Sequence, residues 1–506
     1  MSHAELAGQS LLLSFPGVTP GDELRAALAR TRAAGVILFG ANVASPAQLS
    51  DLCATLQGWA AAEGLPPLLI GIDQEGGTVT RLPAPFVTAP SQMAQAAAGD
   101  PDDARACAAL TGRQLRACGV NLNFAPVADV NSNPANPVIG TRAFGADAPT
   151  VIAFVEAALR GYREAGVVAC VKHFPGHGDT SVDSHLGLPV VEHGPERLKR
   201  VELAPFAAAA RAGAPAMMSA HVVFRALDPR PATLAPPVLR GLLRERLGFD
   251  GLVFTDALDM AAIAASYGPG QAAILARRAG ADIVMPLGPL AGQVAVAEAL
   301  VAGFADGRLS REDGEATMRR LAAARAAYGL GAVPPEALTP GLLAELDATA
   351  LAVARRGLTV RDPGGLLPLA PGTRLAVIEC RQPRFNNAEE AAERTAMLRE
   401  LVAAAFPQAV FLSVSELVTE AERDAALAVA ARAELTVLLT RNAAMVPAQA
   451  ALAAALADRP RLVHVAARGP ADAGLLPGAA ASLCLYGDPP VSMRAMVAAL
   501  ARPGEG

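Results

Sequence analysis

Eight short apolar segments recur between residues 10 and 286, with helical stretches rich in Ala and Leu between them. Each is a near-continuous apolar run that ends in polar residues, which is typical of parallel strands buried on both faces. Eight such repeats predict a TIM (β/α)8 barrel, whose chemistry lies at the carboxyl ends of the strands. An open doubly wound sheet is disfavoured because no Gly-x-Gly-x-x-Gly motif follows the first segment. The predicted strands lie at 10–15, 35–40, 67–73, 120–127, 167–172, 214–220, 251–256 and 281–286, with helices at 102–118, 149–165 and 271–279.

A second alternating pattern begins after residues 328–340, whose Pro and Gly content is typical of a linker. This pattern predicts a smaller α/β sandwich domain, with a parallel sheet covered by helices. We therefore expect a TIM-barrel domain at 1–330, a linker and helix at 331–357, and a C-terminal α/β domain at 358–506. The predicted strands lie at 375–378, 410–414, 435–439, 462–465 and 483–486, with helices near 341–355 and at 388–405.

The composition limits the possible partners. A chain of 506 residues can bury a large core, and its net charge of −5 comes without a basic tail or stripe. With four Tyr, one Trp and fifteen Phe, little aromatic surface is available for base stacking, so we expect no nucleic-acid partner. The six Cys are scattered without a CxxC pair, which predicts small core residues rather than disulfides or a zinc site.

The amino-terminal segment bears on location. Its first eight residues carry an acid and no Lys or Arg, and the apolar run at 11–15 is too short for a signal peptide or a membrane span. We therefore expect a cytoplasmic protein with no membrane partner.

Polar residues are dense at the predicted mouth of the barrel. The third strand ends in Asp73 and is soon followed by Arg81, and the loop after the fourth strand carries Arg142. The fifth strand runs into the loop 172–185, and five of the seven His in the chain lie within 173–221. Histidines that cluster at the mouth of a barrel serve catalysis more often than a core or surface role.

The histidine-rich loop could hold a metal ion through nitrogen and oxygen ligands, namely His173, His177, Asp179, Asp183 and His185. However, Pro175, Gly176 and Gly178 indicate a shaped loop, so the i, i+4 spacing does not place two His on one helix face. A metal site is therefore the minor alternative.

The same residues suit acid–base chemistry. Asp183 and His185 have the composition of a carboxylate–imidazole dyad, in which the carboxylate fixes the His tautomer for proton transfer near neutral pH. Asp256, at the end of the seventh strand, is a candidate nucleophile or electrostatic stabiliser. The structural alternative is an Asp that caps the following helix, and Asp259 is the more obvious cap because it lies nearer that helix.

Five further residues form a predicted binding shell suited to a hydroxyl-rich ligand: Asp73, Arg81, Arg142, Lys172 and His173. Lys172 is one of only two Lys in the chain, and a compact ammonium at this place would differ in use from the many Arg. A phosphate site is the rival use of these bases, but no Gly-rich cradle follows the last strands.

These motifs resemble glycoside hydrolase family 3, specifically the bacterial β-N-acetylglucosaminidases of peptidoglycan recycling. The resemblance runs in order across residues 8–330, and the fourteen-residue loop 172–185 is its most specific part. The second domain matches only at its lead-in, as in two-domain members. The matching stretches in the barrel are 35–40, 72–77, 123–129, 139–144, 172–185 and 254–256, and those of the lead-in are 358–360 and 366–369.

The resemblance implies a retaining double displacement in the barrel. Asp256 would attack the anomeric carbon, and His185, paired with Asp183, would protonate the leaving oxygen and then activate water. Asp73 would bind sugar hydroxyls, and the pocket would be completed by Arg81, Arg142, Lys172 and His173. The substrate would be a GlcNAc-containing carbohydrate, and no metal or organic cofactor is implied.

Two positions depart from the family pattern, since Thr78 stands where an Arg is usual and Ala257 where a second Asp is frequent. Family members without the His loop use a Glu on the second domain as the acid. Glu379 is the candidate for that role here, but the intact loop makes it unnecessary.

Four alternatives to the hydrolase remain: a β-N-acetylglucosaminide phosphorylase, a β-glucosidase, a metal-dependent hydrolase and a non-catalytic sugar-binding barrel. The complete set of Asp183, His185 and Asp256 argues against the last of these. The sequence predicts neither the aglycone nor the oligomeric state.

Overall fold

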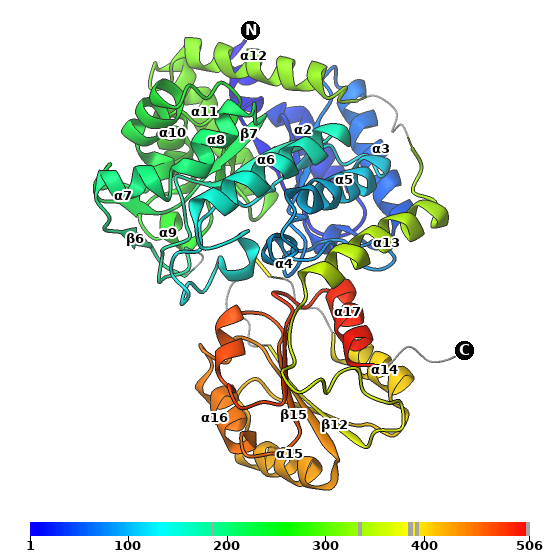
Figure 1. Ribbon diagram of the computed structural model, residues 1–506. Helices are drawn as coiled ribbons and strands as arrows, with labels where there is room; N and C mark the ends of the chain where they lie inside the picture. Colours follow the sequence, from blue (N-terminus) through cyan, green and yellow to red (C-terminus); the bar gives the residue numbers. More distant parts are fainter. Residues whose placement is uncertain (185, 332–335, 383–387, 390–393, 502–506) are drawn as a thin grey trace.

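The computed structural model describes residues 1–184, 186–331, 336–382, 388–389 and 394–501, which form a barrel and a smaller second domain (Figure 1). Eight parallel strands follow one another around the barrel in chain order. A parallel bridge between Leu11 and Val284 joins the first strand region to the last, which closes the barrel. The strands are β1 (Leu12–Leu13), β2 (Gly35–Leu38), β3 (Leu69–Ile72), β4 (Leu122–Asn123), β5 (Val168–Phe174), β7 (Ala216–Ser219), β9 (Leu252–Ala257) and β10 (Ile283–Met285).

All eight predicted barrel strands are therefore confirmed. The inward-facing side chains form one apolar cluster, in which the rings of Phe124 and Phe254 meet edge to face with centroids 5.5 Å apart. Gly71 makes room for this pair, because a Cβ at that position would lie 2.9 Å from Phe124 Cε2. The packed interior forms a floor, so a ligand can enter only above it.

Helices surround the barrel and bury a second apolar layer against the outer faces of the strands. Several begin with a polar cap followed by Pro, a residue whose fixed φ and missing N–H suit the first turn. The main ones are α2 (Asp22–Thr31), α3 (Pro46–Ala62), α5 (Pro101–Ala117), α6 (Ala148–Glu164), α8 (Ala204–Arg211), α10 (Pro269–Ala279), α11 (Leu290–Ala305) and α12 (Arg311–Ala327). The helices predicted at 102–118, 149–165 and 271–279 correspond to α5, α6 and α10.

The second domain is built on one six-stranded sheet in the order β11-β16-β15-β14-β12-β13. Its strands are β11 (Thr359–Arg361), β12 (Leu375–Cys380), β13 (Val410–Val414), β14 (Leu435–Thr440), β15 (Leu462–Ala466) and β16 (Ala481–Cys484). Apolar clusters on both faces are covered by α14 (Thr395–Ala405) and α17 (Pro490–Leu500) on one side and by α15 (Glu420–Arg432) and α16 (Pro447–Leu456) on the other. This arrangement is the predicted α/β sandwich.

Two details of the second domain differ from the prediction. The sheet is not wholly parallel, because β11 pairs antiparallel with β16. All three residues of β11 are exposed, so no apolar run marks this strand in the sequence. Of the helix predicted at 388–405, the structure shows α14 from Thr395 onward, Ala388 and Glu389 are not helical, and positions 390–393 lie outside the described residues.

A long helix, α13 (Pro340–Gly357), is shared by the two domains. Its apolar residues pack between the barrel and α17, with Leu342, Leu346 and Ala350 in one cluster with Val491. Gly357 passes so close to α4 (Gln92–Ala97) that a Cβ there would lie 2.2 Å from the carbonyl oxygen of Ala94. We keep the division at 330 and 358 as our proposal for the domain boundaries.

All six Cys are buried and none is disulfide-bonded, as predicted. Among the described helices, none combines the length and the apolar character that crossing a bilayer requires.

Candidate active site

A cavity of about 710 Å³ lies at the carboxyl ends of the barrel strands. This volume falls in the range of small-molecule sites, and the position is the one where barrel enzymes carry their chemistry. Six of the predicted site residues line it together: Asp73, Arg81, Arg142, Lys172, His173 and Asp256.

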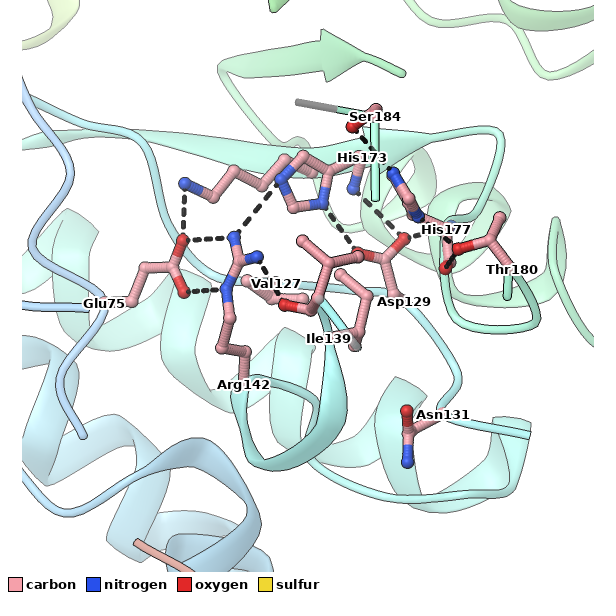
Figure 2. Close-up of polar contacts among 12 residues, drawn as sticks. Glu75, Val127, Asp129, Asn131, Ile139, Arg142, His173, His177, Thr180 and Ser184 are labelled. Atoms are coloured by element: carbon pink, nitrogen blue, oxygen red, sulfur yellow. Dashed lines mark hydrogen bonds and ion pairs between the residues drawn. The ribbon is translucent and has the colours of Figure 1, made fainter. Parts of the chain in front are cut away.

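The base of the cavity holds a compact cluster of four charges. Lys172 Nζ lies 2.7 Å from Asp73 Oδ1 and 2.6 Å from Glu75 Oε1. Glu75 also accepts two hydrogen bonds from Arg142, at 2.9 Å from Nε and 2.8 Å from Nη2 (Figure 2). Arg142 Nη1 donates in turn to the carbonyl oxygen of Val138 at 2.8 Å. Arg142 is thus engaged by Glu75 and by the carbonyl of Val138.

Glu75, Lys172 and Arg142 are charged near neutral pH. Burial alone would raise the pKa of Glu75, but Arg142 and Lys172 outweigh it and hold that pKa well below its usual value. Burial alone would lower the pKa of Lys172, yet Asp73 and Glu75 raise it overall. Two carboxylates and two cations therefore balance each other in a largely buried space.

A second buried carboxylate, Asp129, organises the start of the loop after β5. Asp129 Oδ2 lies 2.7 Å from His173 Nδ1, and Asp129 Oδ1 accepts from the backbone N–H of His177 at 2.6 Å and of His173 at 3.3 Å. Burial would raise the pKa of Asp129, but the two His outweigh this effect and lower it. A carboxylate at Nδ1 favours the tautomer that carries its proton there, which leaves His173 Nε2 as an acceptor 3.4 Å from Arg142 Nη2 (Figure 2).

His177 holds the rest of this loop together. Its Nδ1 lies 2.8 Å from Thr180 Oγ1, and its Nε2 lies 3.0 Å from Ser184 Oγ. Burial, with a smaller contribution from His173, lowers the pKa of His177 to about 4, so the ring is neutral at neutral pH. His177 and Ser184 both line the cavity, so this pair of side chains belongs to the site itself.

The predicted Asp183–His185 dyad is described only in part. Asp183 is 3 % exposed and precedes Ser184 directly, which brings the loop to the edge of the cavity. The backbone carbonyl of Asp183 accepts from the N–H groups of Leu186 and Gly187, each at 3.0 Å. His185 lies outside the described residues, so its role stays a prediction.

Asp256 stands at the end of β9 and lines the cavity. Its Oδ1 accepts from the N–H of Ala257 at 2.8 Å. The following helix α9 (Ala261–Ala264) is preceded by Met260 and has no side-chain cap. The expectation that Asp259 caps this helix was therefore wrong; it lines the cavity instead, because the strand end and the helix are separated by a turn.

The structure also places residues considered for a metal site and for an alternative acid. Of the residues considered for a metal, Asp179 pairs with His193, whereas His177 bonds to Thr180. Glu379 is fully buried in β12 of the second domain, where it lies 2.8 Å from Arg441 Nη2.

The sequence reasoning missed the roles of Glu75, Asp129, His177 and Ser184. A signal was available for two of them, since Glu75 and Asp129 each follow an apolar run that ends a barrel strand. Their partners lie 67 and 44 positions away along the chain, a separation that no local pattern reveals.

The second domain also reaches the cavity. Ala388 is among the lining residues, and its carbonyl oxygen accepts a hydrogen bond from Arg81 Nη1 at 2.8 Å. The Arg81 side chain, which belongs to the barrel, is therefore held by the other domain.

Two known proteins match a little over half of this chain in sequence. Beta-hexosaminidase A of Pseudoalteromonas piscicida is 38 % identical over 322 residues, which are 57 % of this chain and 54 % of that protein, so the chain spans about half of that relative. Beta-hexosaminidase of Thiobacillus denitrificans is 40 % identical over 281 residues, 54 % of this chain and 77 % of that protein.

A solved structure matches nearly the whole chain. The glycoside hydrolase family 3 beta-N-acetylglucosaminidase from Paenibacillus sp. str. FPU-7 superposes with a TM-score of 0.90 at 37 % identity, covering 98 % of this chain and 96 % of that one. Residues 7–324 match the Glycosyl hydrolase family 3 N terminal domain. This match takes in every barrel strand and all the barrel residues of the cavity, and the chain belongs to glycosyl hydrolase family 3.

Proposed function

We propose that this chain is a retaining exo-β-N-acetylglucosaminidase that releases terminal β-linked GlcNAc from muropeptides or related glycans. One observation carries the proposal: Asp256 shares a single cavity with the charge cluster of Asp73, Glu75, Lys172 and Arg142. The names of the relatives support the sugar class, and the proposal places the enzyme in the cytoplasm.

The charge cluster suits the non-reducing sugar. Asp73 is 16 % exposed at its side chain, whereas those of Lys172 and Glu75 are only 3 % and 2 % exposed. Asp73 thus presents its carboxylate to the cavity, where it can accept hydrogen bonds from two sugar hydroxyls. Lys172 fixes that carboxylate through a contact of 2.7 Å, so a hydroxyl-rich ligand meets a preorganised acceptor.

The chemistry takes place in two steps. Asp256 attacks the anomeric carbon as the bond to the leaving oxygen breaks, and that oxygen receives a proton from His185. Water then gives a proton to His185 and its oxygen to the anomeric carbon, which frees the sugar and restores the Asp256 carboxylate. Two inversions at one carbon give net retention.

Release of nitrophenol from its β-N-acetylglucosaminide and its β-glucoside tests the proposal. We expect turnover of the N-acetyl substrate, loss of about 10⁴-fold or more in kcat in Asp256→Asn, and a β-anomer as the first product seen by NMR. Asp250→Asn is the matched control, because Asp250 is 89 % exposed at its side chain and lines a different cavity.

Each other outcome identifies an alternative. Preference for the glucoside would indicate a β-glucosidase, and a sugar 1-phosphate formed only with phosphate would indicate a phosphorylase. Activity lost on adding a chelator would indicate a metal-dependent hydrolase. Binding without turnover would favour a sugar-binding barrel, and activity that survives in Asp256→Asn would refute the nucleophile.

A further inference from the structure

Arg81 lines the cavity and connects the two domains, because its main chain belongs to the barrel and its side chain contacts the second domain. Its backbone N–H donates to Gln74 Oε1 at 2.8 Å, so the barrel fixes its main chain. Its guanidinium donates to the carbonyl oxygen of Ala388 at 2.8 Å, so the second domain helps to fix its side chain. Arg81 is 6 % exposed, and both it and Ala388 line the cavity.

Glu389, the residue after Ala388, is tied to the interior of the second domain. Glu389 Oε2 lies 2.7 Å from Arg468 Nη1, and Arg468 Nε lies 3.0 Å from Asp488 Oδ1. The side chains of Arg468 and Asp488 are 7 % and 1 % exposed. The position of Ala388 is therefore coupled to a buried ion pair through a single neighbouring residue.

That ion pair belongs to a larger network. Asp488 also contacts Arg441, at 2.7 Å, and Arg394, which directly precedes α14. Burial would raise the pKa of Asp488, but its three Arg partners outweigh burial and hold that pKa far below its usual value. With Glu379 at Arg441, three carboxylates face three guanidinium groups, so the charges of the network balance.

The network also borders the barrel. Glu389 and Arg468 line a small crevice of about 90 Å³ together with Val138, Ile139 and Gly140 of the barrel. Val138 belongs to both neighbourhoods, because it lines this crevice and its carbonyl accepts from Arg142 of the charge cluster.

We propose that the second domain sets the affinity of the barrel's sugar site by positioning Arg81 through the carbonyl of Ala388, with Glu389 and Arg468 as positioning residues. The inference rests on the proposed function, and it assigns to the second domain a part in binding rather than in the chemical step. Arg81 reaches the cavity edge, whereas Asp256 and Asp73 are held by the barrel. Loss of the Glu389 contact should therefore raise KM and leave kcat nearly unchanged.

The test compares Glu389→Gln with Glu434→Gln in the full chain, using the nitrophenyl β-N-acetylglucosaminide. Glu434 is a matched control because it pairs with Arg374 in the same domain, at 3.1 Å, with both side chains exposed. We expect KM to rise about fivefold or more in Glu389→Gln with kcat within about twofold, and no change in Glu434→Gln.

A double-mutant cycle with Arg81→Met then separates positioning from a general structural role. If Glu389 acts through Arg81, Glu389→Gln should add no further rise in KM once Arg81 is replaced. An unchanged KM in Glu389→Gln, or effects that multiply in the double variant, would overturn the inference. If Glu389→Gln lowers both kcat and the melting temperature and leaves KM unchanged, its role is only structural, and the inference is overturned as well.

The melting temperatures of the four proteins in the cycle supply a readout that needs no substrate. The coupling predicts that the two single shifts do not add in the double variant, whereas additive shifts would contradict it. If the wild-type chain turns over no GlcNAc substrate but the melting-temperature shifts of the variants are not additive, the proposed function is refuted. The domain coupling is then still supported.

Discussion

Glu75→Gln is the substitution that most directly tests the balanced charge cluster. Glu75 is the shared partner of Lys172 and Arg142, and the three side chains are 2 %, 3 % and 4 % exposed. An amide keeps the shape of the side chain but removes one of two negative charges that face two positive ones. Removing one partner of a buried ion pair costs about 3–5 kcal/mol, because the remaining charge stays buried without compensation. We expect a loss of that size in the free energy of unfolding of the barrel.

The assay follows urea unfolding by tryptophan fluorescence. The chain has one Trp, and Trp59 lies in α3 of the barrel, so the signal reports on this domain. The matched control is Glu298→Gln, which breaks the exposed pair with Arg30 on the barrel surface; such pairs contribute about 0–1 kcal/mol.

A compensating variant checks the cause of the loss. Adding Lys172→Met to Glu75→Gln removes one charge of each sign, so the double variant should be more stable than the sum of the two single effects predicts, by about 1–3 kcal/mol. A Glu75→Gln protein as stable as Glu298→Gln would refute the argument, and so would simple additivity with Lys172→Met.

Three further predictions use the same fluorescence signal or the nitrophenyl assay. His177 has a pKa of about 4 in the folded chain against 6.5 in the unfolded one, so the unfolded state binds more protons below neutral pH. The free energy of unfolding should therefore fall by about 2 kcal/mol between pH 7 and pH 5, and it should fall less in His177→Asn. Asp129→Asn should lower kcat/KM by about 10–100-fold, because an amide cannot accept from every donor around it; unchanged kinetics would contradict this role. Gly71→Ala should lose about 1–3 kcal/mol through the clash with Phe124, whereas Gly292→Ala in α11, where a Cβ meets nothing within 4 Å, should lose none.

The barrel could be predicted because each of its strands lies in a local apolar run that is visible in the sequence. A strand such as β5 is a buried apolar run that ends in charged and aromatic residues, and nothing outside the run is needed to see it. The strands that were missed lack this signal. The strands β6 (Val190–Val191) and β8 (Val223–Phe224) have two residues each, and β11 is exposed throughout.

The candidate site was predicted as a set of residues but not as a set of pairs. Lys172 was singled out as a compact ammonium, and its single nitrogen lies between the carboxylates of Asp73 and Glu75, at 2.7 and 2.6 Å. Arg142 lines the cavity as predicted for a binding residue, and its pairing with Glu75 is what the sequence did not indicate. Pairing of this kind depends on how loops from different strands meet, and the sequence does not encode that in any local pattern.

The contact between Arg81 and the second domain has a consequence for how such a chain can diverge. The acceptor at position 388 is a main-chain carbonyl, which every amino acid supplies. Substitutions at that position can therefore accumulate without removing the oxygen that meets the guanidinium. A survey of related chains for invariant side chains would pass over this position, even where the geometry it provides is the same in all of them.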